Sequence, residues 1–370
     1  MRKLFLFMLS LLAAPGTADE SAQSSRLSAL LSEDGNAGFE YATAKRPFSF
    51  PQDHGPHEGY RNEWWYVTGN LDGEDGRRFG FELTIFRFSL KPTAPAMDSN
   101  WRTRQVYIAH LAVTDANGKR FHVAERYSRG AIGLAGAQAE PFRVWIDDWE
   151  MASGGADSPW RVRAADEQFG IDLTMVPLKK PVLNGDAGLS RKSSDIQSAS
   201  YYYSIPRMQT EGTMSVGGRD FNVSGLSWLD REWSTSALAP DQVGWDWFAL
   251  QLSDGTDLML YKIRKADGSN DEYSSGTATL ADGDSIALRP GDFEIRVEDR
   301  WKSPKGGVYP SRWTVSVPGQ GLRLDITPVI ADQELFTTVR YWEGAVDVAG
   351  ERSGKPVSGR GYVELTGYAD

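Results

Sequence analysis

The feature that most constrains the fold of this chain is a tryptophan-rich hairpin pattern that occurs twice. The segments NEWWYVTGNLDGEDG, from residue 62, and GWDWFALQLSDG, from residue 244, each start with tryptophans, continue as an alternating strand and end in an Asp-Gly turn. At a shift of 181 residues, Trp64 aligns with Trp245, Tyr66 with Trp247 and Leu71 with Leu252. An alternating strand that ends in Asp-Gly is typical of an antiparallel hairpin.

Two further pairs of segments match in the same order. VSGLSWLD (223–230) aligns with VSGRGYVE (357–364), and WRVRAADEQFGIDLTMVP (160–177) aligns with WTVSVPGQGLRLDITP (313–328). Convergent strand composition explains one such match better than three, so we infer two related β-domains.

The predicted fold is therefore all-β, with two tandem lipocalin-like antiparallel barrels packed together. We place the N-terminal domain at 48–235 and the C-terminal domain at 240–370, with the seam between Ser234 and Gly244. An eight-stranded barrel is just wide enough to hold one small ligand. We expect Trp64 and Trp245 to be core residues that plug one end of each barrel.

The first residues, MRKLFLFMLSLLAAPGTADE, indicate export. A basic start, a short apolar stretch and small residues up to Ala18 are typical of a secretory signal peptide at 1–18. The mature chain would begin near Asp19, in the periplasm or outside the cell, and an uncleaved anchor is the alternative. Residues 19–47 are expected to form an N-terminal extension with a short helix around Ser25 to Leu31.

Charge and cysteine content exclude several classes of function. The formal net charge of -10 argues against a nucleic-acid partner, which needs a basic face. The chain has no cysteine, which excludes disulfides and thiolate nucleophiles. Serine-hydrolase and phosphate-loop motifs are missing from the sequence. His54 and His57 lie in a Gly/Pro-rich loop, where a hydrogen-bonding role is favoured over zinc. No cofactor and no metal are expected.

Several long motifs resemble those of the AttH/CrtC family of tandem lipocalin-like proteins. They include RNEWWYVTGNL, FGFELTIFRF, SGLSWLDREWS and GWDWFALQLSDGTDLMLYKIR, and the likeness runs from about Phe48 to the C-terminus. The resemblance implies two packed calycin barrels and a cavity for a bulky apolar molecule. The family contains carotenoid hydratases, proteins labelled predicted secreted hydrolases, and suspected accessories of ABC transporters.

The resemblance also points to particular residues. A His and a Trp that matter in the hydratase branch match Arg231 and Trp233, so the Trp is kept and the His is replaced. Tyr261 matches a downstream Tyr of the hydratases. These differences argue against carotenoid hydration itself.

Carboxyl groups beside aromatic residues are the strongest chemical signal in the residues themselves. In SWLDREW, strand alternation puts Trp228, Asp230 and Glu232 on one face, and Arg231 and Trp233 on the other. A carboxyl group in an aromatic pocket has a raised pKa and can donate a proton at neutral pH. The alternative is a structural ion pair between Arg231 and one of these carboxylates.

Two sets of candidate residues follow. The catalytic candidates are Asp230, Glu232, Arg231 and Tyr261. The candidates for substrate binding are Trp228, Trp233, Trp247, Asp246, Tyr203 and Glu343.

The leading hypothesis is an exported protein that binds a bulky hydrophobic molecule and acts as a hydratase or isomerase on a carbon–carbon double bond of a terpenoid-like substrate. One alternative is a non-catalytic periplasmic carrier or accessory of an ABC transporter. A second is a hydrolase, as the family label says. A scaffold with filled barrels and no ligand is a further alternative.

Overall fold

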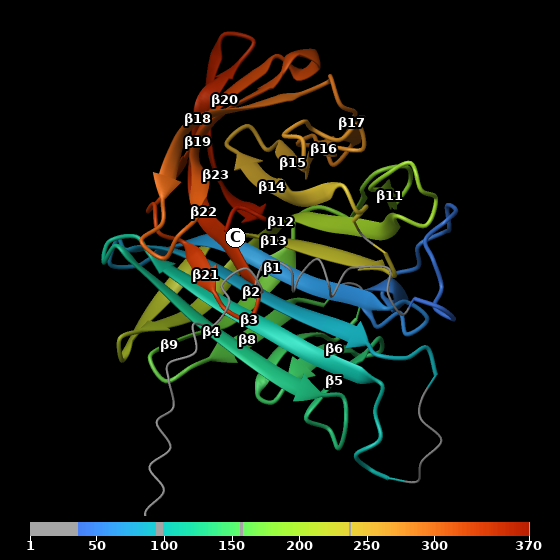
Figure 1. The fold of residues 1–370 in the computed structure, drawn as a ribbon. Helices are drawn as coiled ribbons and strands as arrows, with labels where there is room; N and C mark the ends of the chain where they lie inside the picture. The colour runs from blue at the N-terminus through green and yellow to red at the C-terminus, as the bar shows by residue number, and fades with distance from the viewer. Residues whose placement is uncertain (1–35, 94–98, 156–157, 237, 370) are drawn as a thin grey trace, which may run out of the picture.

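A computed structural model describes residues 36–93, 99–155, 158–236 and 238–369. These residues form strands almost throughout, with two short 3-10 turns, η2 (Gln52–His54) and η3 (Pro318–Gln320), so the all-β prediction is confirmed (Figure 1). The expected signal peptide and the short helix lie outside the described residues. Within the described ranges, no helix is long and apolar enough to cross a membrane.

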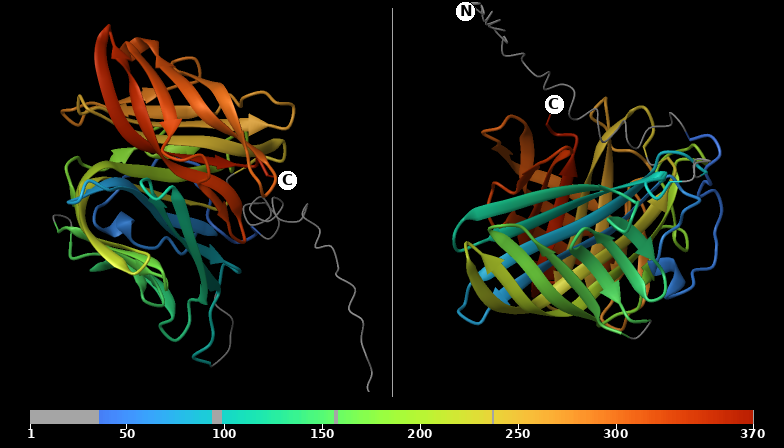
Figure 2. Two further views of the ribbon diagram at one scale, coloured as in Figure 1. Left: turned by 90° about the vertical axis from the view of Figure 1, so that its left-hand side faces the viewer. Right: turned by 90° about the horizontal axis from the view of Figure 1, so that it is seen from below.

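The first sheet is a nearly closed barrel made by the first thirteen strands of the described chain. Its strands are β1 (Asn62–Gly73), β2 (Arg78–Ser89), β3 (Gln105–Asp115), β4 (Arg120–Arg129), β5 (Ala135–Gln138), β6 (Phe142–Ile146), β7 (Trp149–Ser153), β8 (Trp160–Ala165), β9 (Phe169–Pro177), β10 (Val182–Leu183), β11 (Leu189–Arg191), β12 (Ala199–Val216) and β13 (Arg219–Ser234). Their order is β4-β3-β2-β1-β13-β12-β9-β8-β7-β6-β5, and β10 and β11 both pair with β12. Figure 2 shows this sheet curling round when it is seen from below.

The second sheet is a half-barrel made by the remaining strands of the described chain. They are β14 (Gln242–Leu252), β15 (Asp257–Lys265), β16 (Ser275–Thr279), β17 (Ser285–Leu288), β18 (Glu294–Lys302), β19 (Val308–Val317), β20 (Leu322–Pro328), β21 (Glu334–Phe336), β22 (Arg340–Arg352) and β23 (Lys355–Thr366). Their order is β17-β16-β15-β14-β23-β22-β20-β19-β18, with β21 on β22. In Figure 1 this sheet lies above the first.

Strand pairing reproduces the internal repeat. β1 lies between β2 and β13 in the first sheet, and β14 lies between β15 and β23 in the second. The register is also the same, because Leu71 lies opposite Gly225 and Leu252 lies opposite Gly359. The chain passes from one sheet to the other between the end of β13 at Ser234 and the start of β14 at Gln242.

Side chains from one face of β1 contribute to the core of the first sheet, and side chains from one face of β14 contribute to the core of the second. Trp65 is buried in the first core, and Phe248 is buried in the second. Trp64 and Trp245 point the other way, toward the space between the sheets, and are only partly buried. The prediction that these two tryptophans plug the barrels is therefore wrong, because alternation along β1 gives the interior position to Trp65.

A third cluster of aromatic and apolar side chains joins the two sheets. The sheets approach closely at Gly80 on β2, where an added Cβ would lie 2.7 Å from Ala345 Cβ and 2.8 Å from the Tyr362 hydroxyl. Asn70 on β1 donates a hydrogen bond of 3.0 Å to the carbonyl oxygen of Gly361 on β23. Side-chain and backbone contacts thus fix one sheet against the other.

Candidate functional site

A pocket lies between the two sheets and is walled by both of them. Its cavity volume is about 120 Å³ for the centres of water-sized molecules, and the pocket is partly open to solvent. Its lining is mostly aromatic and apolar but contains several ionisable groups: Lys192, Asp230, Glu232, Glu343, Glu364 and His110. The pocket therefore lies at the interface between the two halves of the chain, which is a favoured position for small-molecule sites.

Asp230, on β13, is a buried carboxyl in the first wall. Its Oδ1 accepts hydrogen bonds from Ser204 Oγ at 2.5 Å and from Trp228 Nε1 at 2.6 Å, and the Tyr202 hydroxyl donates to its Oδ2. Burial raises the pKa of Asp230 to about 7, although these three hydrogen bonds act in the opposite direction. The group can therefore both hold and release a proton near neutral pH.

Glu232 lies two residues further along the same face and has a different environment. It forms an ion pair of 3.1 Å with Lys192 and accepts a hydrogen bond from Ser200. Burial lowers the pKa of Lys192, but the Glu232 carboxylate outweighs this and raises it. Lys192 also bonds Ser190 Oγ at 3.1 Å, and that hydroxyl lies 3.0 Å from the hydroxyl of Tyr261.

The second wall carries an acidic pair. Glu343 on β22 lies directly opposite Glu364 on β23, and both line the pocket. Burial raises the pKa of Glu364 to about 8, and the charges of Glu232 and Asp230 contribute. Burial, followed by the charges of Glu82 and Glu364, raises the pKa of Glu343 well above its ordinary value. Glu343 Oε1 has no hydrogen-bond partner among the described residues.

The two walls present equivalent positions of the repeat. Asp230 lies opposite Tyr66 on the first strand of its half, and Glu364 lies opposite Trp247 on the first strand of the other. On its other side Asp230 lies opposite Ser204, where Glu364 has Glu343. Asp230 therefore has the hydroxyl of Ser204 beside it, whereas Glu364 has a second carboxyl, that of Glu343, at the equivalent position.

His110 on β3 lines the pocket and uses both ring nitrogens. Its Nδ1 lies 2.7 Å from the Tyr341 hydroxyl, and its Nε2 lies 3.0 Å from Glu125 Oε1. Glu125 is held in turn by the backbone N–H of Thr338 at 3.1 Å. The imidazole is therefore fixed between the two sheets.

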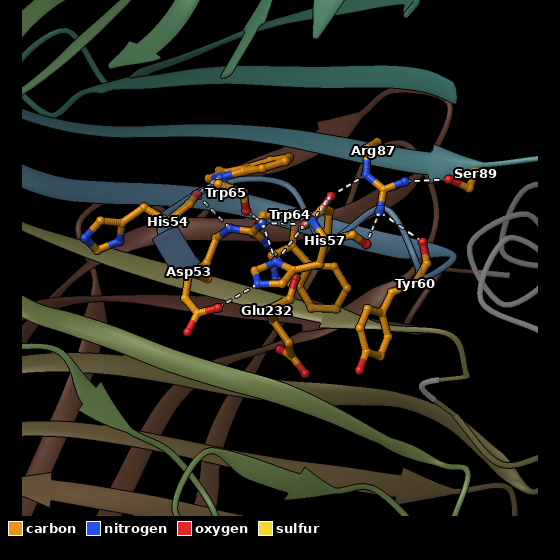
Figure 3. A network of polar contacts seen from close by, with 12 residues as sticks. Asp53, His54, His57, Tyr60, Trp64, Trp65, Arg87, Ser89 and Glu232 are labelled. Atoms are coloured by element: carbon orange, nitrogen blue, oxygen red, sulfur yellow. Dashed lines mark hydrogen bonds and ion pairs between the residues drawn. The ribbon is translucent and has the colours of Figure 1, made fainter. Parts of the chain in front are cut away.

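A separate charged network lies on the opposite face of β1 and β13, inside the first barrel (Figure 3). Arg231 and Arg87 both form ion pairs with Glu63, and all three side chains are fully buried. Burial alone would raise the pKa of Glu63, but the two arginines hold it well below its ordinary value. The Arg231 guanidinium also lies 3.9 Å from the ring centre of Trp65. Arg231 therefore pairs with Glu63, and the predicted pair with Asp230 or Glu232 is wrong because those side chains point the other way.

The loop before β1 completes this network. The imidazole of His57 stacks on Trp233, with ring centres 3.7 Å apart, and its Nε2 lies 3.0 Å from Asp53 Oδ1. His54 Nδ1 lies 2.6 Å from the Tyr203 hydroxyl. Both histidines thus have hydrogen-bonding roles in the closure of the barrel end.

The structure brings some of the predicted site residues together and separates others. Asp230, Glu232, Tyr261, Trp247 and Glu343 line the pocket, and Trp228 reaches it through its bond to Asp230.

Arg231, Trp233 and Tyr203 point into the first barrel. Asp246 lies on the β14 face away from the pocket, where Arg264 Nε donates to its Oδ1 at 3.0 Å.

Sequence reasoning missed Lys192, His110, Tyr202 and Glu364. A signal for Glu364 was present, because the repeat aligns it with Asp230. Tyr202 lies next to the candidate Tyr203 in the sequence, and alternation along β12 gives the two side chains opposite faces. Lys192 lies in an irregular loop after β11, where the sequence has no periodic pattern from which the direction of a side chain could be predicted.

Known proteins were compared with this chain. Residues 41–368 match the model of the AttH-like family. A crystal structure of a candidate AttH from Nitrosomonas europaea is 34% identical, covers 90% of this chain and 100% of its own, and superposes with a TM-score of 0.79.

Two fungal proteins are more distant. Kievitone hydratase from Nectria haematococca is 17% identical, with 90% of this chain and 98% of its own covered and a TM-score of 0.65, which is a likeness of fold. The dehydratase asqC of Emericella nidulans is 25% identical over 222 residues, which span 55% of this chain and 60% of that relative.

Proposed function

The chain belongs to the AttH-like family, and from that premise we propose that it adds water to a carbon–carbon double bond of a bulky apolar molecule held between its sheets, or forms such a bond by removing water from the corresponding alcohol. The observation that carries the proposal is Asp230, a buried carboxyl in an aromatic pocket whose pKa is raised to about 7 by burial. Two carboxyls on one strand face with different partners are a recurring arrangement for separate acid and base roles.

In the hydration direction, Asp230 is the proton donor. Its O–H bond breaks as the π electrons of the substrate form a new C–H bond, and positive charge develops on the neighbouring carbon. The rings of Tyr66 and Trp247 line the same pocket and can stabilise that charge. Glu232 accepts a proton from the water whose oxygen bonds to the carbon, and Lys192 holds that carboxylate in place. Dehydration is the reverse of these steps.

The named relatives support a lyase of the hydratase type. One is called a dehydratase and another a hydratase, names that denote removal and addition of water. A terpenoid-like substrate remains part of the proposal on the basis of the size and aromatic lining of the pocket.

A carrier is the second candidate, and the mostly apolar lining of the pocket favours it. In that case the protein would be exported and would deliver its ligand to a transporter. N-terminal sequencing of native protein tests the export part, and we expect the mature chain to start near Asp19. A chain that retains Met1 would contradict export.

Isotope labelling separates the enzyme from the carrier. Purified protein is incubated in ¹⁸O-labelled water with terpenoid alkenes and the matching tertiary alcohols, and the products are analysed by mass spectrometry. We expect labelled alcohol or dehydrated product, with the rate strongly reduced in Asp230→Asn. Compounds that bind, measured by calorimetry, but never gain label or lose water would overturn the catalytic proposal and favour the carrier.

A further inference from the structure

The ionisable groups of the pocket are strongly unbalanced. Its lining contains four carboxyls, on Asp230, Glu232, Glu343 and Glu364, against one ammonium group, on Lys192. Lys192 is already engaged by Glu232, and within the described structure no cation lowers the pKa of Glu343 or Glu364. Buried carboxyls without a counter-charge hold their protons, and a cationic ligand would favour their ionised forms.

Several buried polar atoms on that side lack partners. Glu343 is 1% exposed and Tyr66 is 6% exposed, and both line the pocket. Glu343 Oε1 and the Tyr66 hydroxyl are neighbours, but neither has a hydrogen bond of good geometry among the described residues, and the same holds for Glu82 Oε2 and the Tyr362 hydroxyl beside them. Most buried polar atoms in native proteins are hydrogen-bonded, so such atoms in a pocket wall mark where a ligand group binds.

Aromatic rings surround the same part of the pocket. Trp64, Phe86, Trp245 and Tyr341 come from both sheets and line it together with Tyr66. Aromatic faces attract cations, and rings combined with carboxylates are a known arrangement for binding organic ammonium groups. The described residues contain no group of three or more ligands arranged to hold a metal ion, so an organic cation fits this site better.

We propose that the pocket selects an amphiphile with a protonated amine, whose ammonium group binds between Glu343 and Tyr66 while its apolar body lies along the aromatic walls. The inference rests on the proposed function in using the same pocket, and it adds the chemical class of the substrate. It also predicts that an acid of the same shape binds more weakly, because its carboxylate cannot supply the positive charge that stabilises ionised Glu343 and Glu364.

Binding of the amine should be linked to proton release. Without a ligand, burial raises the pKa of Glu364 to about 8, and burial with the charges of Glu82 and Glu364 raises that of Glu343 well above its ordinary value. The buried carboxyl of Glu82 on β2 interacts with both groups, and its own pKa is also raised. A bound ammonium favours the ionised forms, so protons leave these carboxyls when the amine binds near pH 7. Calorimetry in two buffers with different ionisation enthalpies measures that release directly.

The test uses three ligands with one tricyclic body: dehydroabietylamine, dehydroabietinol and dehydroabietic acid. We expect the amine to bind at least about ten-fold more tightly than the acid, a difference of about 1.4 kcal/mol, with the alcohol between them. Glu343→Gln should remove most of this preference and leave alcohol binding nearly unchanged. Glu351→Gln, at an exposed position of the same strand, is the matched control.

The outcomes distinguish this inference from the proposed function. Alcohol and acid that bind as tightly as the amine would overturn the inference and leave the hydratase proposal standing. Failure of all three ligands to bind would count against both. Thermal unfolding checks that Glu343→Gln is folded, and Tyr66→Phe provides a second variant that should weaken amine binding.

Discussion

Asp230 and Glu364 occupy the same position in two related halves of one chain, yet their surroundings differ. Asp230 accepts hydrogen bonds from Ser204, Tyr202 and Trp228. Glu364 lies opposite Glu343, a carboxyl where the first half has Ser204. Burial raises the pKa of both groups, to about 7 and about 8.

This difference shows how one repeat can supply two functions. Three donors fix the Asp230 carboxyl in one orientation, as a proton donor requires. A carboxyl beside another carboxyl is suited instead to bind a positive group. The change of one neighbouring residue, from serine to glutamate, therefore separates a wall suited to chemistry from a wall suited to recognition.

The largest expected effect comes from removing the acid itself. Asp230→Asn keeps the shape of the side chain but cannot donate the proton, so we expect kcat to fall by about 10²- to 10⁴-fold. Glu364→Gln should change ligand affinity more than kcat. The labelling assay and calorimetry measure the two effects, and circular dichroism confirms folding. Equal loss of turnover in both variants would contradict the division between the walls.

The buried network behind Asp230 should affect stability and not chemistry. Arg231→Met leaves Glu63 with one fewer cation in a fully buried position, which should lower the free energy of unfolding by about 3–5 kcal/mol. Urea denaturation measures this loss. Ligand binding by the remaining folded protein should persist. An Arg231→Met protein that is fully stable but inactive would instead show that Arg231 has a role in the reaction.

The raised pKa values predict how stability depends on pH. In the native state Asp230 and Glu364 hold protons that an unfolded chain releases near pH 4, so this stabilisation is full below pH 4 and is lost as pH rises through 7 and 8. For each carboxyl the slope reaches about 1.4 kcal/mol per pH unit between its unfolded and its native pKa, and solvent screening of Glu364, which is partly exposed, narrows that pH range.

Urea denaturation between pH 5 and pH 9 measures this slope. Compared with the unmodified protein, Glu364→Gln should lose less stability as the pH rises. Parallel curves for the two proteins would show that Glu364 does not hold a proton at neutral pH.

The smallest expected effect comes from a variant that removes one of the hydrogen bonds that distinguish Asp230 from Glu364. Ser204→Ala removes a hydrogen bond that lowers the pKa of Asp230. Such a bond to a charged group is worth about 1.5–3 kcal/mol, so the basic limb of the pH–rate profile should move up by roughly one to two pH units. Thr213→Ala, at a partly exposed position of the same strand, is the control. An unchanged profile would show that Asp230 is not the titrating group.

Much of the fold was predictable because the same alternating strand pattern occurs in both halves of the sequence. Trp64, Trp245 and their neighbouring turns identified the first strand of each half, and strand pairing reproduces that alignment. Periodicity gives two faces but does not say which face is interior. That is why Trp64 was assigned to the barrel core, where Trp65 is found.

The site was predictable only in part, for a related reason. Alternation along SWLDREW correctly grouped Asp230 with Glu232 and separated them from Arg231. It could not reveal that Glu63 neutralises Arg231 from another strand, or that Lys192 reaches Glu232 from a loop. Such partners depend on tertiary contacts between residues far apart in the chain.

The pairing of equivalent residues across the pocket has a consequence for the origin of the protein. If a gene for one half had duplicated, the pocket would descend from the interface of an ancestral homodimer. In that dimer each wall would have carried the same acid, and neither copy could have changed without changing the other. Fusion into a single chain would have removed this constraint, so that the positions of Ser204 and Glu343 could change independently and the two walls of the pocket could become different.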